Sequence, residues 1–338
     1  MTIAFYNNAW KRLSPGKALL LSFLVAAAWP APHKLLGQER PIAFKHLTID
    51  DGLSQSLIHA ILQDRTGYMW FGTQDGLNRY DGYRFTVFKN DAFDSTSISG
   101  NEVTALYEDR AGNLWIAAGM LNRFDPQTER FARYALLPEQ RERPNALFIT
   151  EICEDQNGAL WLGTAGHGLF RVQRAEGEGQ SAEGEEQRAK GERRSSLYAL
   201  SPPRFTVTHY THNPNDPASL SDNNVHTVYV DRRGVLWAGT HAGLDRLELN
   251  AATNAFTHFT FENDGLSQNH IFSLHEDEHG TLWLGTFAGL SKLLTPAQGP
   301  ARFAHYLHPS GAFEAEWRGQ VRDIQESRDE RGRKLWLA

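Results

Sequence analysis

The stretch that decides the fold is DRTGYMWFGT, residues 64–73. Its D-x-x-G-x-x-W core returns at regular intervals along the 338-residue chain. The five copies begin at Asp64, Asp109, Asp155, Asp231 and Asp277. Internal repeats of this length decide an architecture before any single motif does. A degenerate sixth copy reaches Trp336.

Each repeat predicts a tight turn between two short strands. Asp at the first turn position can accept a hydrogen bond from the backbone two residues later, and Gly at the fourth suits a positive φ. A mostly apolar run of six residues precedes the turn, as in 58–63, and a second run carries the Trp, as in 68–73. A Gly-Leu pair opens a third run in most repeats, and an aromatic run such as 85–88 forms a fourth. These runs have the length of strands, so each repeat predicts four of them.

The spacing of the repeats identifies the architecture. Trp70 and Trp115 are 45 residues apart, and Trp237 and Trp283 are 46 residues apart. Four strands in about 40–50 residues make one blade of a β-propeller. We therefore predict an all-β fold, a β-propeller of four-stranded antiparallel blades, with five full repeats, a partial sixth and an incomplete ring. We expect the Trp to fill space between blades and the Gly two residues later to let sheets approach closely.

The predicted organisation is a leader followed by a propeller at 41–338. Residues 1–40 place basic residues ahead of an apolar run, 18–29, which is typical of a signal peptide and short for a membrane span. The third blade contains an insertion, 173–203, whose core has almost no apolar residue, so we predict that it is disordered. The predicted blades occupy about 57–90, 102–135, 147–210, 224–260, 270–307 and, in part, 320–338.

The repeated string W-[FL]-G-T-x-x-G-L-x-R, with D-x-x-G before it, resembles the two-component regulator propeller repeat. That repeat fills the periplasmic sensor region of many bacterial sensor histidine kinases, including the hybrid type. The stretch FKHLTIDDGLSQ, residues 44–55, looks like the start of such sensors, and the resemblance covers roughly 42–338. In that family an immunoglobulin-like domain, a membrane span and a kinase core usually follow two propellers. None of these is present here, so the chain resembles an N-terminal fragment.

The resemblance implies a periplasmic, ligand-sensing input that has no chemistry of its own. The parent protein would be a histidine kinase anchored in the inner membrane. The implied partners are a glycan or another small ligand, the remaining blades, and the downstream membrane and kinase domains of a dimeric sensor. Two alternatives stay open, namely a secreted propeller lyase or hydrolase that acts on polysaccharides, and a secreted interaction platform without a kinase.

The composition argues against several functional classes. A net charge of −6 with both signs interspersed disfavours nucleic-acid binding, which needs a basic face. The single cysteine, Cys153, cannot form an internal disulfide. None of the fourteen histidines lies in a metal-binding motif, and motifs for a serine nucleophile, a phosphate loop or a dinucleotide are absent. We predict no catalytic residue, no metal and no cofactor.

The candidate binding residues lie in the hairpins between the second and third strands. The spacing from the Trp to the following Leu is six residues in the second repeat, eight in the third and seven in the others. Such variation marks a surface loop, and loops on a rigid scaffold usually carry binding. The predicted ligand-binding residues, which differ between repeats, are Gln74, Asp75, His167, His241 and Phe287.

Overall fold

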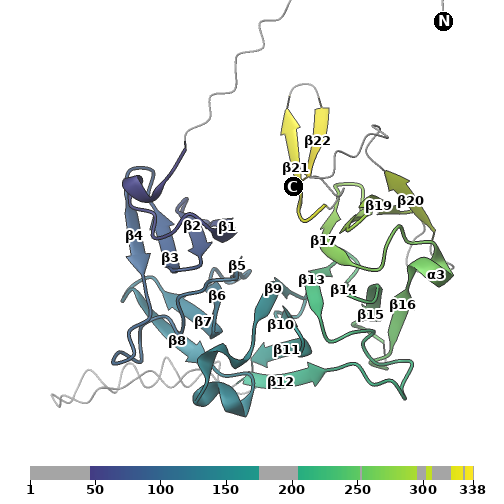
Figure 1. Ribbon diagram of the computed structural model, residues 1–338, viewed down its shortest axis with the longest axis horizontal. Coiled ribbons are helices and arrows are strands. Elements are labelled where there is room, and N and C mark those ends of the chain that lie inside the picture. The colour runs from purple at the N-terminus through teal and green to yellow at the C-terminus, as the bar shows by residue number, and fades with distance from the viewer. Residues whose placement is uncertain are drawn as a thin grey trace, which may run out of the picture. The chain divides into compact units, whose positions relative to one another are not determined.

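Five antiparallel sheets of four strands follow one another along the chain (Figure 1). The computed structural model describes residues 46–174, 205–251, 253–294, 302–306, 321–329 and 332–337. In every four-stranded sheet the strands lie in sequence order, each paired with the next. This arrangement confirms the predicted all-β fold of four-stranded antiparallel blades.

The strands of the five blades have the following bounds. The first blade contains β1 (Ile58–Gln63), β2 (Met69–Thr73), β3 (Gly76–Tyr80) and β4 (Phe85–Phe88). The second contains β5 (Ala105–Glu108), β6 (Leu114–Ala118), β7 (Met120–Asp125) and β8 (Arg130–Tyr134). The third contains β9 (Ile149–Glu154), β10 (Leu160–Thr164), β11 (Gly168–Arg174) and β12 (Phe205–Tyr210). The fourth contains β13 (Val225–Val230), β14 (Val235–Thr240), β15 (Leu244–Glu248) and β16 (Phe256–Phe259). The fifth contains β17 (Ile271–Glu276), β18 (Leu282–Thr286), β19 (Gly289–Leu293) and β20 (Phe303–Tyr306).

A two-stranded hairpin follows the fifth blade, where the sequence predicts a partial sixth. Its strands are β21 (Ile324–Asp329) and β22 (Gly332–Leu337). The described helices are short: η2 (Ile49–Asp51), η3 (Pro138–Arg141), η4 (Pro144–Ala146) and α3 (Phe261–Asp264). In the third blade β11 pairs with β12, so the predicted insertion joins the third and fourth strands. The signal peptide predicted at 1–40, and residues 175–203 of the insertion, lie outside the described residues.

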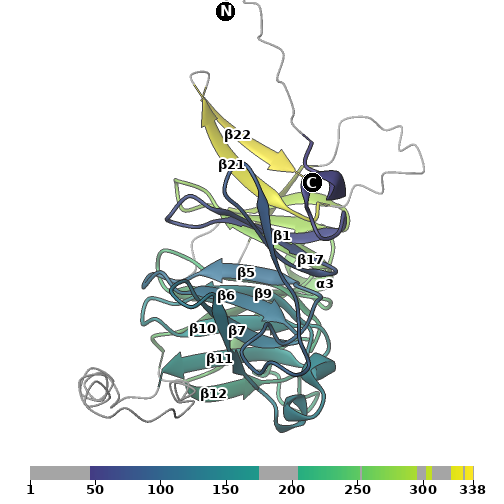
Figure 2. The ribbon, with the colours of Figure 1, turned by 90° about the vertical axis from the view of Figure 1, so that its left-hand side faces the viewer.

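The first strands of successive blades, β1, β5, β9, β13 and β17, lie next to one another in chain order (Figures 1 and 2). They belong to one compact unit of the chain, residues 47–338. An apolar residue of the first strand packs against the blade that precedes it in the chain. Ile152 of β9 and Val228 of β13 are therefore only 4% and 1% exposed. Ile61 occupies the same position in β1 and is 59% exposed. In the described structure β1 therefore presents an apolar face that no blade covers.

The repeated Asp fixes both the turn and the Trp side chain. In the third blade one carboxylate oxygen of Asp155 accepts hydrogen bonds from the backbone N–H groups of Asn157 (2.9 Å) and Ala159 (3.0 Å). The other oxygen accepts the indole N–H of Trp161 at 3.0 Å. The same Asp–Trp bond occurs in all five blades, at distances from 2.6 to 3.1 Å. The turn glycines, such as Gly158 with φ 79°, adopt the predicted positive φ.

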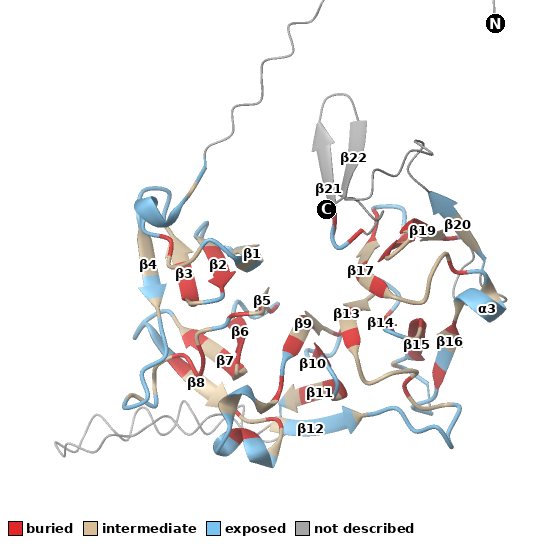
Figure 3. Cartoon of the chain, in the orientation of Figure 1, coloured by how far each residue is buried: buried red, intermediate tan, exposed pale blue. Residues whose placement is uncertain are grey.

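The hydrophobic core lies between neighbouring blades, and the repeated Trp contributes to each junction. Buried residues concentrate in the second and third strands of the blades (Figure 3). Trp70 of the first blade lies edge to face against Phe124 of the second, with ring centroids 5.1 Å apart. Trp115 of the second blade contacts Phe205 of the third in the same way, at 5.8 Å. These contacts confirm that the Trp fills space between blades.

The glycine two residues after the Trp lies against the first strand of the next blade. A Cβ at Gly239 would lie 2.8 Å from a methyl carbon of Ile271, and 2.5 Å from a methyl carbon of Thr227 in its own blade. This confirms the predicted close approach. In four blades the pairing opposite this glycine skips one residue of the first strand, which forms a β-bulge, a feature that re-aims side chains. The skipped residues are His59, Thr150, His226 and Phe272.

Side chains link consecutive blades at the end that carries the D-x-x-G turns. The guanidinium of Arg110, in the turn of the second blade, donates to the carbonyl of Asp155 in the turn of the third at 3.0 Å. The equivalent bonds at other junctions run from Arg65 to Asp109, from Gln156 to Arg232 and from Arg232 to Glu278. Four turn residues, Arg65, Arg110, Gln156 and Arg232, thus hold neighbouring blades together at this end.

Candidate functional site

The opposite end of the blades carries the residues that differ from blade to blade, and we name it the variable face. It consists of the hairpins between second and third strands and the segments that enter the first strands. Backbone hydrogen bonds join the two, since the N–H of His241 donates to the carbonyl of Asn224 (3.1 Å) and that of Phe287 to His270 (3.3 Å). Three positions per blade define this face, namely 13 and 11 residues before the repeated Trp and 4 residues after it.

Five aromatic rings converge on the variable face of the fourth and fifth blades, and we name them the imidazole cluster. His241 and His270 lie edge to face with ring centroids 3.6 Å apart. His226 lies 5.5 Å from His241 and 6.4 Å from His270. Phe272 lies 5.3 Å from His226, and Phe287 lies 6.2 Å from His270. Two of the five, His226 and Phe272, are bulge residues, so the bulges of adjacent blades aim their side chains at one spot.

The cluster imidazoles differ from structural histidines in their hydrogen bonding. Within the described residues, no ring nitrogen of His226, His241 or His270 bonds to another protein atom, and Nε2 of His226 is buried without a partner. Both ring nitrogens of His258, by contrast, are occupied, by the Asp245 carboxylate at 2.7 Å and by a backbone carbonyl at 2.9 Å. A buried polar atom without a partner costs free energy. A structural role therefore accounts for His258 but not for the buried Nε2 of His226, while His241 is exposed.

The surroundings of His226 and His270 disfavour their protonated forms. Burial lowers the pKa of His226 most, and the neighbouring imidazoles of His241 and His270 lower it further. Burial, followed by His241, also lowers the pKa of His270. The carboxylate of Asp222 opposes both shifts. At pH 7 the rings of His226 and His270 are therefore neutral, and a proton on one ring hinders protonation of the next.

One charged group contacts the cluster, and two acidic residues lie on or next to strands that neighbour β13 and β17. The guanidinium of Arg322, which precedes β21, lies 5.7 Å from the ring centroid of Phe272. Asp323 follows it in the chain, and Glu151 lies on β9. Burial raises the pKa of Glu151 to about 7, and the charge of Asp323 adds to that shift. An oxygen of Glu151 accepts the N–H of Val228 at 2.9 Å, which ties this carboxyl to β13.

The structure brings together two of the five predicted ligand-binding residues. His241 and Phe287 both lie in the imidazole cluster. Gln74 is exposed in the first blade, and Asp75 beside it forms an ion pair of 2.6 Å within that blade. His167 lies in the third blade, and no ring contact in the described structure joins it to the cluster. The role of these three residues in binding stays a prediction.

Three of the five rings, His226, His270 and Phe272, are not among the residues predicted from the sequence. They lie in or just before the first strands, where the pattern predicts apolar scaffold. A signal was nevertheless present, because the residue 13 before the Trp differs in every repeat, and the residue 11 before it is His, Thr or Phe. The residues there, blade by blade, are Leu57 and His59, Glu102 and Thr104, Phe148 and Thr150, Asn224 and His226, and His270 and Phe272.

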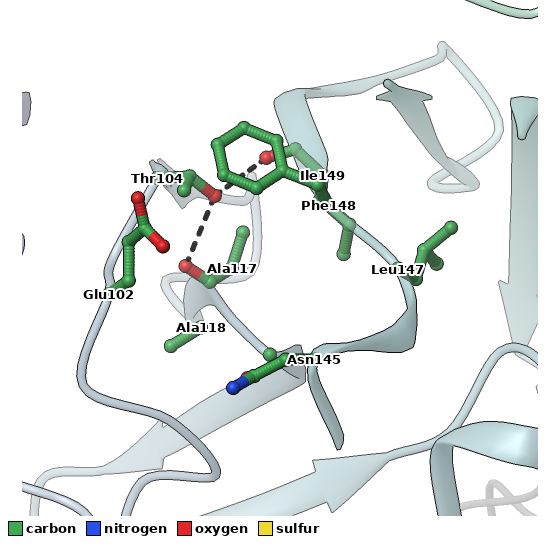
Figure 4. A pocket seen from close by; sticks show the side chains of 9 residues that line it. Glu102, Thr104, Ala117, Ala118, Asn145, Leu147, Phe148 and Ile149 are labelled. Carbon is green, nitrogen blue, oxygen red and sulfur yellow. Dashed lines mark hydrogen bonds between the residues drawn. The ribbon is translucent and has the colours of Figure 1, made fainter. Parts of the chain in front are cut away.

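A small cavity lies on the variable face between the second and third blades (Figure 4). Its volume is about 100 Å³, and Glu102 and Phe148 are among the residues that line it. Ala117 stands here in place of the glycine that meets the next blade elsewhere. The hydroxyl of Thr104 donates to the carbonyl of Ile149 at 2.6 Å and so spans the junction beside the cavity.

The described residues offer neither a metal site nor a membrane-spanning helix. No group of three or more His, Cys, Asp or Glu side chains among them could hold a metal ion, and this includes the imidazole cluster. The described helices have at most four residues, and none is long and apolar enough to cross a bilayer.

Five segments of the chain match the model of the two-component regulator propeller. They are residues 52–75, 97–119, 144–166, 219–242 and 265–288. A stretch of 81 residues, 24% of this chain, is 44% identical to Histidine kinase P4 of Formosa agariphila. That stretch corresponds to 5% of the kinase, so this chain spans a small part of its relative.

Two extracellular domains from B. thetaiotaomicron have a similar structure. The domain of the hybrid two component system BT3049 superposes with a TM-score of 0.62 and 25% identity, over 87% of this chain and 34% of that one. The domain of the hybrid two component system BT4673 superposes with a TM-score of 0.57 and 21% identity, over 87% of this chain and 36% of that one. The chain thus spans about a third of each of these domains. The similarity to the BT4673 domain is evidence for the fold alone.

Proposed function

We propose that this chain, which is built of two-component regulator propeller repeats, is an extracytoplasmic ligand-binding input of a two-component sensor. The repeats match along the chain, and similar structures are extracellular domains of two-component systems. The observation that carries the ligand-binding part is the imidazole cluster. Five rings from two adjacent blades meet on the variable face, and three of them keep their ring nitrogens unoccupied by the described protein atoms.

The cluster has the mixed character of a small-molecule site. Its phenylalanine rings offer apolar surface, and its imidazoles can donate or accept hydrogen bonds. A glycan fragment or another small ligand with both apolar and hydroxyl-bearing faces suits this combination. Since the rings come from the fourth and the fifth blade, a ligand would contact both blades together. In this proposal the chain itself performs no catalysis.

A ligand at this junction can act as a signal only if it binds two states of the sensor with different affinity. The junction of the fourth and fifth blades allows such a difference in affinity, because the contacts within the cluster depend on the relative position of these two blades. The membrane anchor, the kinase core and the dimer that would read this difference belong to the proposed parent protein, located in the inner membrane with its input in the periplasm.

Binding measurements on matched variants test this function. The purified chain is titrated with a panel of mono- and oligosaccharides by calorimetry, and the same panel is assayed for turnover. For the ligand that binds, we expect His241→Ala and Phe287→Ala to weaken binding at least tenfold, about 1.4 kcal/mol. His279→Ala removes an exposed imidazole at the turn end of the fifth blade, outside the cluster, and should bind like the parent chain. Unchanged binding in both cluster variants contradicts the proposal, and turnover would favour the enzyme alternative.

A further inference from the structure

We propose that the imidazole cluster and Arg322 form an oxyanion-binding site, which takes up protons when a carboxylate- or sulfate-bearing ligand binds. This inference rests on the proposed function, because it names the chemical class of ligand for the same site. It begins from the three imidazoles whose ring nitrogens have no described protein partner.

The geometry allows one anion to reach several of these nitrogens. The ring centroids of His241 and His270 are 3.6 Å apart, and that of His226 is within 6.4 Å of both. A neutral imidazole has one N–H donor and a protonated one has two. An oxyanion has several acceptor oxygens, so it can satisfy donors from more than one ring, including the buried Nε2 of His226.

One charged group near the cluster, Arg322, favours an anion, and another, Asp222, opposes it. Arg322 brings a guanidinium to Phe272, and a guanidinium pairs with carboxylate or sulfate through two parallel N–H donors. The acid that acts on the cluster is Asp222, and one of its oxygens already accepts the backbone N–H (2.6 Å) and the side-chain amide (3.0 Å) of Asn224. Among the described residues, Asp222 acts on the cluster imidazoles and Arg322 contacts Phe272, while Glu151 and Asp323 act on each other.

Proton uptake follows from the neutral starting state of the rings. Burial and mutual repulsion keep His226 and His270 neutral at pH 7 because both effects lower their pKa values. An anion within about 4–6 Å favours a charged imidazole and raises its pKa by about 1–3 units. Affinity for an anion of constant charge should therefore rise as the pH falls from 8 to 5.5. A neutral ligand at the same rings would lack this dependence.

Inorganic sulfate is a suitable probe, because it stays a dianion between pH 5.5 and 8. The full chain is titrated with sodium sulfate at constant ionic strength set by chloride, and the imidazole resonances are followed by NMR. We expect the cluster resonances to titrate at higher pH in sulfate, and sulfate to bind at least tenfold more tightly at pH 5.5 than at pH 8. Glucuronate compared with glucose then shows whether a carboxylate on a sugar ring is taken in the same way.

Variants separate the cluster from the rest of the surface. The double variant His241→Gln/His270→Gln keeps polar side chains and should lose the pH-dependent part of sulfate binding. His279→Gln, whose parent side chain is 70% exposed at the turn end of the fifth blade, is the matched control and should bind sulfate like the parent chain. Sulfate binding that is equal at both pH values, or equal in the double variant, overturns the inference.

The outcomes also distinguish this inference from the proposed function. If a neutral sugar binds with an affinity that depends on Phe287 and is independent of pH, the proposed function is supported and the oxyanion inference fails. If sulfate binding depends on the imidazoles while the affinity for every organic ligand is independent of Phe287, the oxyanion inference holds and the proposed function fails. If neither binding responds to any cluster variant, both proposals fail.

Discussion

The indole N–H of Trp161 donates to the carboxylate of Asp155, six residues earlier in the chain, at 3.0 Å. Asp155 is 1% exposed and Trp161 is also 1% exposed. The Asp closes the turn with one oxygen and orients the indole with the other, so the D-x-x-G-x-x-W spacing reflects a single hydrogen-bonded unit. This unit brings the Trp into the junction with the next blade, where Val228 and Leu236 pack in the same cluster.

The first prediction concerns this unit in the fourth blade. Asp231 is 4% exposed and accepts hydrogen bonds from Arg233 N, Val235 N and Trp237 Nε1. Asp231→Ala leaves buried donors without a partner, so we expect a loss of about 3 kcal/mol in the free energy of unfolding. Urea denaturation followed by Trp fluorescence measures it.

A turn without the Trp bond provides the control for that prediction. Asp81 also accepts two backbone N–H groups, from Tyr83 and Arg84 at 2.8 Å, but lies on the surface between β3 and β4. Asp81→Ala should therefore cost clearly less than the change at Asp231. Equal losses at the two sites would show that the Asp acts only as a turn residue.

The second prediction concerns the close approach of blades at Gly239. Its backbone φ is not in the left-handed region, so the effect of a side chain there is steric. Gly239→Ala places a methyl group against Thr227 and Ile271, and we expect a loss of about 2 kcal/mol, measured by thermal unfolding. Ala117→Gly is the reverse exchange at the same position of the second blade and should cost about 1–2 kcal/mol, through backbone freedom and the loss of one buried methyl group. A neutral Gly239→Ala would refute the steric account.

The third prediction concerns the links between blades. Arg110 is 57% exposed as a side chain, yet its guanidinium bonds the carbonyl of Asp155 in the next blade. We expect Arg110→Ala to lower stability by about 1 kcal/mol, because it removes a charge-assisted hydrogen bond and stem packing. Arg84→Ala, whose parent side chain is 85% exposed and pairs within its own blade, should change stability little in the same unfolding assay. The link has no stabilising role if the two variants unfold alike.

The fourth prediction concerns pH and the His258–Asp245 pair. The hydrogen bond to Asp245 raises the pKa of His258, against the opposing effect of burial. A folded-state pKa above the unfolded value of about 6.5 means that the pair stabilises the fold fully below that pH. This stabilisation is lost as the pH rises through the folded-state pKa. The stability difference between parent and His258→Gln should therefore be about 1 kcal/mol larger at pH 5.5 than at pH 9.

The fifth blade supplies the control for the pH effect. His305 has the equivalent place and bonds the hydroxyl of Ser291 (3.0 Å) and the carbonyl of Gly265 (2.8 Å). Since Ser291 carries no charge, His305→Gln should lack the pH-dependent loss. If His258→Gln has the same cost at both pH values, the ionic character of its pair is refuted.

The blades were predictable from sequence because local signals agree there. The same hairpin is predicted by the turn at Asp64, by Gly67 and by the strand-sized apolar runs. The prediction is strengthened because the pattern occurs five times in the chain. The Asp–Trp bond was not predicted, because it joins side chains that meet only once the hairpin has formed.

The candidate site was predictable only in part, for a physical reason. The hairpin residues His241 and Phe287 stood out because hairpins vary in length and sequence. His226 and Phe272 did not, because the pattern treats their segments as regular strands. Their orientation depends on a bulge opposite the glycine, and that bulge is a property of the pairing between strands.

The bulges have a consequence for how this protein can change. A bulge residue has no partner in the strand ladder, so its replacement leaves the pairing of β13 with β14, or of β17 with β18, intact. The side chains at His226 and Phe272 can therefore be exchanged while Gly239 and the Asp–Trp units stay as they are. If the cluster binds a ligand as proposed, recognition and folding are encoded by separate sets of residues, and a few substitutions at the bulges would change ligand preference at little cost in stability.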